Sequence, residues 1–466
     1  MEGKKLGIVI TDGVGFRNFI LSDFIFEAQR NFPHVIIYSC IPIIAYKDFN
    51  FQCKIVELPE FKEHFTTWFF RKAKEVAHLQ KFASTNFGIN DNLKINNSKT
   101  FNFRGYATRF IYLITRFFHS ESTILFLTVL QQFTFGGYKI SKHIYNILKK
   151  DDVNVLFFTH QRPPFIAPLI YQAGKLKIKT AAFIFSWDNL ASKGRMAGNF
   201  DYYLVWSSLM KSDLLHFYSS IKETKIEIVG TPQFEPYVLE RYQTSKATFY
   251  KKFNLDLSFK TICFSCGDIS TSKNDALYIE LIANFILANQ FIEKVNFIVR
   301  TSPAEDGNRF DVVRKKFTFI KWNIPKWDLT RDKHQEIWTQ RIPTVEDVFD
   351  LRSILEHSDI FINMLSTMSL DAMIFGKPVI NPVFGNYENG LFDDQKFLKY
   401  NHIKHVVNLK ATAIVKEENE LLDAINNALE NATIRFQQQK ELIRLEIGKP
   451  LVGTSHRIAL TLLKWS

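Results

Sequence analysis

Short apolar runs alternate with segments of helical periodicity along most of the chain. The run KLGIVI (5–10) ends in the polar turn TDGVGF, and a helical pattern and the run HVIIYSC (34–40) follow it. The alternation pauses at residues 60–150 and continues with VNVLFFTH (153–160) and TAAFIFSW (180–187). Strands that alternate with helices in this way predict a parallel sheet with helices on both faces.

A second series of the same kind begins after a polar stretch near residues 240–258. Its apolar runs include KTICFSCGD (260–268), KVNFIVRTSP (294–303), DIFINM (359–364) and KPVINPVF (377–384). A chain of 466 residues is also too long for one ordinary core. The pattern therefore predicts two doubly wound α/β domains, residues 1–240 and 241–445, and a C-terminal helix within 446–466 that packs back on the first domain.

Residues 60–150 form a helical insertion in the first domain, in which Lys and Arg alternate with aromatic residues. Examples are TTWFFRKAKEVAHLQKF (66–82) and FRGYATRFIYLITRFFH (103–119). One interpretation is a helix bundle that covers the domain. The other is a basic amphipathic surface that rests on anionic lipid.

The charge of the chain favours anionic partners, because the formal net charge is +12. Phosphorylated substrates, nucleic acid and an acidic membrane surface are candidates, but no RNA-binding motif occurs and we expect no nucleic acid. The N-terminus runs straight into a strand, and the apolar stretch 122–138 is too short and interrupted for a membrane span. Four cysteines are too few for a disulfide scaffold, so we expect a cytoplasmic protein.

Polar residues follow three predicted strands of the second domain. Ligands of doubly wound sheets bind beyond the carboxyl ends of strands, at helix N-termini. The run DIFINM is followed by Ser366 and Thr367, which suit a diphosphate, and by Asp371, which lies about one turn deeper and can reach a ribose. The alternative is that the hydroxyls only cap the helix.

The other two strand ends add to this predicted nucleotide site. One carries Arg300 and Thr301, where an arginine can clamp a phosphate or make an ordinary ion pair. The other carries Gly267, Asp268 and Ser270, in a turn small enough for close approach to phosphate or sugar. An ordinary tight turn is the alternative there.

The stretch EDVFDLRSILEHSDIFINMLSTMSLDAMIFGKPVINPVF resembles the donor-binding half of GT-B glycosyltransferases. It is also similar to the related glycerophosphotransferases that build teichoic acids from CDP-glycerol, and the resemblance covers roughly residues 260–390. It implies two Rossmann-like domains that face a central cleft, and a metal-independent enzyme without a cofactor. It also implies that Ser366 and Thr367 meet the donor diphosphate and that Asp371 meets the ribose or sugar. Asn363 to Leu365 replace the family's usual histidine or glycine, which leaves the donor open.

The first domain is expected to supply the acceptor site and the catalytic base. Asp12, His160 and Asp188 each follow a predicted strand, and an inverting transfer needs a base for the acceptor hydroxyl. Of these three, position favours Asp12, although each can serve a local turn or cap instead. The loop FIFSWDNLASKGRM resembles loops of bacterial surface-polysaccharide transferases, and it contributes four predicted substrate-binding residues: Trp187, Asn189, Lys193 and Arg195.

These features predict a glycosyltransferase that moves a sugar from a nucleotide-sugar donor to a hydroxyl of a cell-surface glycan, such as lipopolysaccharide, or of a lipid-linked precursor. Peripheral contact with the inner face of the cytoplasmic membrane would suit such an acceptor. The alternatives are a polyol-phosphate transferase that uses a CDP-alcohol, a nucleotide-sugar epimerase, and a non-catalytic basic protein that binds glycans or nucleic acid.

Overall fold

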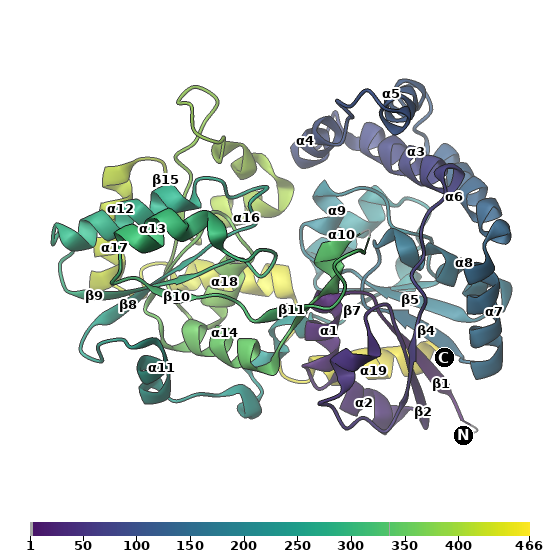
Figure 1. Cartoon of the computed structure of the whole chain (residues 1–466), viewed down its shortest axis with the longest axis horizontal. Coiled ribbons are helices and arrows are strands. Elements are labelled where there is room, and N and C mark those ends of the chain that lie inside the picture. The colour runs from purple at the N-terminus through teal and green to yellow at the C-terminus, as the bar shows by residue number, and fades with distance from the viewer. Residues whose placement is uncertain (1–2, 335) are drawn as a thin grey trace. The chain divides into compact units, whose positions relative to one another are not determined.

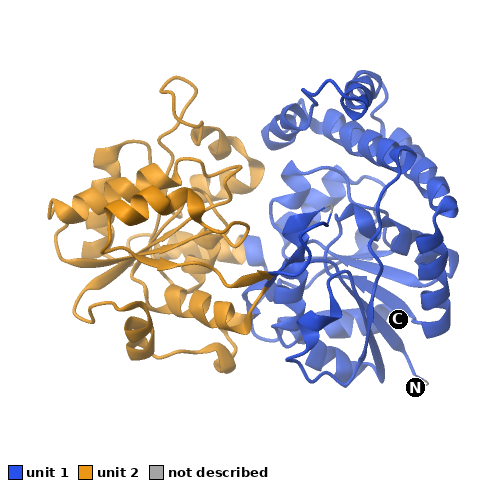
Figure 2. Ribbon diagram, viewed as in Figure 1, with its two compact units in different colours: residues 1–235, 329–342, 446–466 blue, residues 236–328, 343–445 orange. Residues whose placement is uncertain are grey.

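The computed structural model describes residues 3–334 and 336–466, which form two compact units (Figures 1 and 2). The first unit comprises the chain up to Glu235 together with Leu329–Ile342 and Glu446–Ser466. The second comprises Pro236–Asp328 and Pro343–Leu445. Each unit is built on its own parallel sheet, which confirms the predicted α/β class with two doubly wound sheets.

The sheet of the first unit has the strand order β3-β2-β1-β4-β5-β6-β7, and every pairing in it is parallel. The strands are β1 (Lys5–Ile10), β2 (His34–Ser39), β3 (Lys54–Glu57), β4 (Val155–Phe158), β5 (Lys179–Phe183), β6 (Tyr202–Val205) and β7 (Ile226–Ile228). The helices are α1 (Gly13–Ile20), α2 (Phe24–Asn31), α3 (Phe65–Phe82), α4 (Phe87–Ile95), α5 (Phe103–Thr115), α6 (Glu121–Thr134), α7 (Lys139–Asp151), α8 (Ala167–Lys175), α9 (Asn189–Ser192), α10 (Ser208–Phe217) and α19 (Thr454–Trp465).

Aromatic side chains fill the layer between this sheet and its first helices. Phe19 of α1 meets Phe157 of β4 and Phe183 of β5 edge to face, each with ring centroids 5.3 Å apart. Contacts of this kind bury large apolar areas and also contribute through their geometry. The central strands are therefore held rigidly, and the residues at their carboxyl ends are fixed in place.

The sheet of the second unit has the order β10-β9-β8-β13-β14-β15 and is also parallel throughout. Its strands are β8 (Lys260–Ser265), β9 (Val295–Arg300), β10 (Lys321–Asn323), β13 (Ile360–Ile362), β14 (Val379–Pro382) and β15 (Ala413–Val415). The helices after Pro236 are α11 (Lys246–Phe253), α12 (Asp275–Leu287), α13 (Asp311–Lys316), α14 (Val345–His357), α15 (Met368–Ile374), α16 (Asn401–Leu409), α17 (Glu418–Glu430) and α18 (Phe436–Ile447).

Residues 329–342 belong to the first unit, although the sequence pattern placed them in the second domain. The short strands β11 (Trp327–Leu329) and β12 (Arg341–Pro343) pair with each other, and the chain between them belongs to the first unit. There it crosses the start of α1 so closely that a Cβ atom on Gly13 would lie 1.6 Å from the Arg341 carbonyl oxygen. Only glycine permits this approach.

The C-terminal helix α19 belongs to the first unit and packs on α2. The Trp465 ring stacks on Tyr202 of β6 with centroids 4.5 Å apart. At the other end of the helix, the Glu235 carboxylate accepts a hydrogen bond from the Ser455 backbone N–H at 3.0 Å. The C-terminal helix therefore packs within the first unit and is not part of the second.

A buried ion pair joins β9 to α14 in the second unit. Nη2 of Arg300 donates to both carboxylate oxygens of Asp347, at 3.0 and 2.9 Å, and both side chains are almost fully buried. Arg300 also donates to Asn323 of β10, and the indole N–H of Trp327 donates to Asp347. Removing one member of such a pair leaves the other charge uncompensated in the interior.

We predict that Arg300→Ala lowers the free energy of unfolding by about 3–5 kcal/mol, measured by urea denaturation. Arg30→Ala serves as the control, because Arg30 is 75% exposed and pairs only at the surface with Glu27. Exposed pairs of this kind contribute little. Equal effects of the two substitutions would contradict a structural role for the Arg300–Asp347 pair.

Candidate active site

The order of strands reverses once in each sheet, between β1 and β4 in the first and between β8 and β13 in the second. In open α/β sheets, ligands bind beyond the carboxyl ends of the strands at this reversal, because the loops there turn toward opposite faces and leave a crevice. The residues that follow β1, β4, β8 and β13 are therefore the first candidates for a site in each unit.

At the reversal in the first unit, Asp12 and His160 form a buried hydrogen-bonded pair. Asp12 follows β1 and caps α1, with Oδ1 accepting the Gly15 backbone N–H at 2.7 Å. Oδ2 accepts from Nδ1 of His160 at 2.7 Å and from the Thr11 hydroxyl at 2.9 Å. Strands β1 and β4 are parallel neighbours, so their carboxyl ends lie side by side at the same edge of the sheet. This is how residues 148 positions apart come together.

The surroundings of the pair favour an ionised Asp12 and a neutral His160. The hydrogen bonds and the nearby imidazole hold the pKa of Asp12 below its usual value, against the effect of burial. Burial lowers the pKa of His160, although the Asp12 charge opposes this. An ionised carboxylate can only accept, so Nδ1 of His160 carries the proton and Nε2 retains a lone pair.

The Nε2 atom of His160 has no hydrogen-bond partner within the described part of the chain, although it is buried. The imidazole stacks on Phe185, which follows β5, with ring centroids 3.9 Å apart. Trp338, in the 329–342 segment, lies 6.2 Å from it. Buried polar atoms nearly always have a partner. A neutral imidazole that is fixed on one side and unsatisfied on the other is suited to accept a proton from a substrate.

The loop after β5 carries the predicted substrate-binding residues, and Gln161 ties it to the His160 strand end. Nε2 of Gln161 donates to the Asn189 side chain at 3.1 Å, and its carbonyl oxygen accepts the Phe185 N–H at 3.1 Å. Trp187 and Asn189 are buried, whereas Asp188 is half-buried and lies 3.5 Å from the Lys193 ammonium. The loop thus brings Asn189 near the pair and leaves Lys193 partly exposed.

Arg195 is buried, and its charge is already balanced. Its guanidinium donates to the Glu121 carboxylate of α6 at 2.6 Å and lies 4.2 Å from the centroid of the Tyr218 ring. This arrangement fastens the helical insertion to the body of the unit. The structure therefore gives Arg195 a positioning role, in place of the substrate contact expected from the sequence.

At the reversal in the second unit, the turn after β8 is built around Gly267 and Asp275. A Cβ atom on Gly267 would lie 2.0 Å from the Ser272 hydroxyl oxygen, so only glycine fits. The Gly267 N–H donates to Asp275 at 2.9 Å, and Arg309 donates to the Gly267 carbonyl oxygen at 2.8 Å. Burial raises the pKa of Asp275 to about 8. Asp268 and Ser270 form the exposed tip of the same turn.

The turn after β13 is organised by Asn363. Its side-chain oxygen accepts the Ser366 N–H at 2.8 Å and the Ser369 hydroxyl at 3.1 Å. Leu365 has a φ of 49°, a left-handed conformation that is uncommon for leucine and is found at strained turns. Ser366 and Thr367 are half-buried at the start of α15 and remain reachable from outside.

Asp371 lies on the buried side of α15 and accepts a hydrogen bond from the Tyr237 hydroxyl. Arg300 is likewise committed to Asp347, as described above. Asp371 and Arg300 were expected to contact ribose and phosphate, but each is bonded to a protein side chain and therefore has a structural role next to the site. Thr301 is different, because its buried hydroxyl has no partner among the described residues.

Several buried polar atoms of the second unit lack a partner within residues 3–334 and 336–466, and they follow β8, β9, β13 and β14. They are Oγ of Ser272, Oδ1 of Asp275, Oγ1 of Thr301, Nδ2 of Asn363 and Oδ1 of Asp394. Other such atoms lie elsewhere in the unit, at Arg314, Ser358 and Thr412 for example, but a polar ligand at this edge would satisfy these five. The sequence patterns did not single out Ser272, Asp275 and Asp394, although Asp275 is a carboxylate at the first position of α12, which is a recognisable signal.

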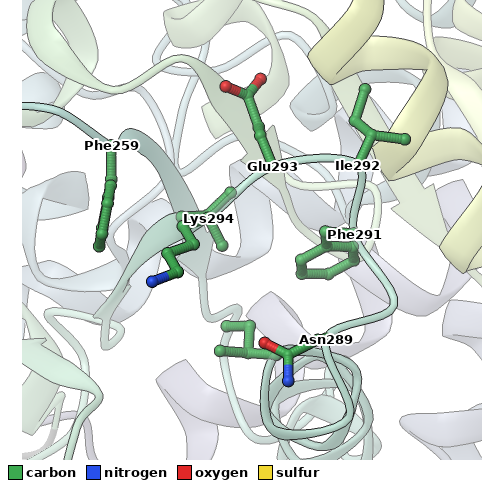
Figure 3. A pocket seen from close by; sticks show the side chains of 8 residues that line it. Phe259, Asn289, Phe291, Ile292, Glu293 and Lys294 are labelled. Carbon is green, nitrogen blue, oxygen red and sulfur yellow. The ribbon is translucent and has the colours of Figure 1, made fainter.

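A cavity of about 400 Å³ lies at the opposite edge of the same sheet (Figure 3). Phe259 and Lys294 line it just before β8 and β9, and Asn289 and Phe291 line it after α12. It therefore sits at the amino ends of the strands, away from the reversal edge. Its position does not match where doubly wound sheets bind ligands.

Among the described residues, no cluster of three or more His, Cys, Asp or Glu side chains is placed to hold a metal ion. Within the same residues, no helix combines the length and the hydropathy that crossing a bilayer requires.

The fold of the chain is similar to that of several proteins of known structure. No family model and no curated protein matches the chain by sequence. By structure, it is similar to a UDP-GlcNAc 2-epimerase from Methanocaldococcus jannaschii, at 13% identity and a TM-score of 0.54, over 99% of this chain and 100% of that one. It is equally similar to a glycosyltransferase from Rickettsia africae, at 12% identity and a TM-score of 0.53, over 100% and 98%.

The wall teichoic acid polymerase TagF aligns at 11% identity over 99% of this chain and 88% of its own, with a TM-score of 0.48. At identities this low, the similarity concerns architecture alone. The chain has a GT-B-type fold, as its second half suggested by sequence.

We predict that His160 titrates below pH 6.5, its ordinary value, in an NMR titration of the histidine side chains. Asp12→Asn should lower this pKa further, because the carboxylate charge that favours the imidazolium is lost. Asp188→Asn is the matched control and should lower it less, since Asp188 is the weaker of the two influences. A titration above the ordinary value in the unaltered protein would contradict the neutral imidazole.

Proposed function

We propose that the protein is an inverting, metal-independent glycosyltransferase that uses a nucleotide-sugar donor and a hydroxyl acceptor on a cell-surface glycan or lipid-linked precursor. The observation that carries this proposal is the Asp12–His160 pair at the strand reversal, with Nε2 of His160 unpartnered within the described residues. The GT-B fold and the polar reversal edge of the second unit support it.

In the proposed reaction, the acceptor oxygen attacks the anomeric carbon of the donor sugar. The acceptor proton passes to Nε2 of His160, and the bond from the anomeric carbon to the diphosphate oxygen breaks with its electron pair on the leaving group. Asp12 holds the tautomer and stabilises the imidazolium that forms, because its carboxylate accepts from Nδ1. This makes His160 the base and Asp12 its positioning residue. Asp188, the third candidate, sits half-buried beside Lys193.

We place the donor at the reversal edge of the second unit. Ser366 and Thr367 are accessible there, and the Thr301 hydroxyl has no hydrogen-bond partner among the residues that the structure describes. The turn at Gly267, Asp268 and Ser270 is small and its tip is exposed, so a phosphate or a sugar can approach it closely. The solved structures of similar fold include a UDP-GlcNAc 2-epimerase with UDP-GlcNAc bound and an S. aureus protein with UDP bound, which makes a uridine nucleotide the first ligand to test.

The donor can be identified by thermal-shift measurements with UDP-, GDP-, CDP- and dTDP-sugars and with CDP-glycerol. A ligand that binds only the native state raises the melting temperature with its occupancy, so the true donor stands out. Selective stabilisation by CDP-glycerol would favour a polyol-phosphate transferase. Conversion of a UDP-sugar without any acceptor would favour an epimerase. Stabilisation by none of them would contradict a nucleotide-dependent enzyme.

We predict that Thr301→Val and Ser366→Ala each weaken donor binding by about 10- to 100-fold, since each removes a hydrogen bond to a charged diphosphate. Isothermal titration calorimetry measures this. Ser258→Ala is the matched control, because Ser258 is an exposed hydroxyl just before β8, at the opposite edge of the sheet. If both test variants bind the donor as tightly as the unaltered protein, the donor does not bind at this edge of the sheet.

We predict that His160→Gln lowers kcat by about 10²- to 10⁴-fold while the KM for donor stays nearly constant. Asp12→Asn preserves the helix cap, since Asn also caps well, but removes the charge that stabilises the imidazolium. In the unaltered enzyme, kcat/KM should fall only at a pH below the ordinary histidine value of 6.5, as His160 becomes protonated. Full activity of His160→Gln would exclude it as the base.

A further inference from the structure

Helices α5 and α6, which both pack on α3 (Figure 1), have their polarity reversed relative to ordinary surface helices. The buried positions of α5 are Gly105, Thr108, Ile111 and Thr115, and those of α6 are Ile124, Thr128 and Gln131. A surface helix of a globular protein normally turns its apolar stripe inward. Here only Ile111 and Ile124 among the buried residues are large and apolar, whereas most of the large apolar side chains of both helices point outward.

The outward faces carry large apolar side chains at helical spacing. On α5 and the turn after it they are Phe103, Tyr106, Phe110, Leu113 and Phe117, and on α6 they are Phe126, Val129 and Phe133. Phe101 and Phe118 extend the same surface, and the exposed fractions of the phenylalanines range from 53 to 85%. Clusters of exposed apolar side chains mark sites of association. We call these ten residues the aromatic face.

The charges around the aromatic face determine what can cover it. Residues 92–150 contain nine Lys and Arg residues and one acidic residue, Glu121. Glu121 is engaged by Arg195 and by Lys81, so its charge is compensated within the unit. The basic side chains are exposed except for Arg109, which is half-buried beside the Tyr106 ring. A second copy of the chain would bring the same positive charge against this face, whereas an anionic surface would neutralise it.

We propose that the aromatic face is the membrane-binding surface of this protein and that its partner is an anionic lipid bilayer. The phenylalanine side chains enter the boundary between headgroups and acyl chains, and Lys99, Arg116 and Lys139 stay at the level of the lipid phosphates. Interfacial helices have this combination of an apolar face with basic flanks. The association places the protein on the bilayer without spanning it, and it requires no nucleotide donor.

The test is cosedimentation of the full chain with vesicles of phosphatidylcholine alone and of phosphatidylcholine mixed equally with phosphatidylglycerol. We expect binding to the anionic vesicles that weakens with added salt. The variant Phe103→Ser/Phe110→Ser/Phe117→Ser should bind at least about tenfold more weakly, because each exposed ring loses its transfer into the bilayer. Lys99→Gln/Arg116→Gln/Lys139→Gln should lose about fivefold per residue on anionic vesicles only.

The matched control is Leu257→Ser/Leu287→Ser/Val312→Ser, which removes apolar side chains of similar exposure from the second unit. It should bind vesicles like the unaltered protein. All substituted side chains are exposed, so circular dichroism and donor binding should be unchanged in each variant. The proposal is overturned if the anionic vesicles do not bind the protein or if the phenylalanine variant binds as well as the control. It is also overturned if the aromatic face instead holds a dimer in solution, which sedimentation velocity detects.

Discussion

Every strand pairing in the two main sheets is parallel, and this constraint decides where chemistry can occur. Parallel strands bring their carboxyl ends to one edge, so residues far apart in the sequence meet there. Asp12 and His160 meet in the first unit, and the turns at Gly267 and Asn363 meet in the second. The buried aromatic layer behind the first sheet keeps that edge rigid.

Asp12 links folding to the proposed chemistry, because one carboxylate serves both. Its Oδ1 caps α1 and its Oδ2 orients His160. A buried carboxylate charge is costly without hydrogen bonds, and the three donors Thr11, Gly15 and His160 together keep Asp12 ionised. The imidazole is then held in one tautomer before any substrate arrives. Such preorganisation reduces the rearrangement needed in the transition state.

Local patterns were sufficient to predict both sheets, because burial and periodicity are properties of short stretches. Pairings between distant residues could not be read in this way. From their positions, Arg300 was expected to bind phosphate and Arg195 to bind substrate, yet their partners Asp347 and Glu121 lie 47 and 74 residues away. The same limitation hid the 329–342 segment, whose place in the first unit depends on its passage across Gly13.

The buried arginines and the exposed basic residues differ in their ability to attract an anionic partner. Arg195 and Arg300 are each paired with a carboxylate in the interior, so neither contributes attraction for a distant anion. The excess lies elsewhere: residues 92–150 account for eight of the twelve net positive charges. All of these basic side chains except Arg109 are exposed, and Arg104, Arg109 and Arg116 alternate with residues of the aromatic face along α5 and the turn after it. The basic composition, which first suggested anionic partners of several kinds, therefore reflects mainly this one region of the first unit, and it fits the proposed attraction to anionic lipid.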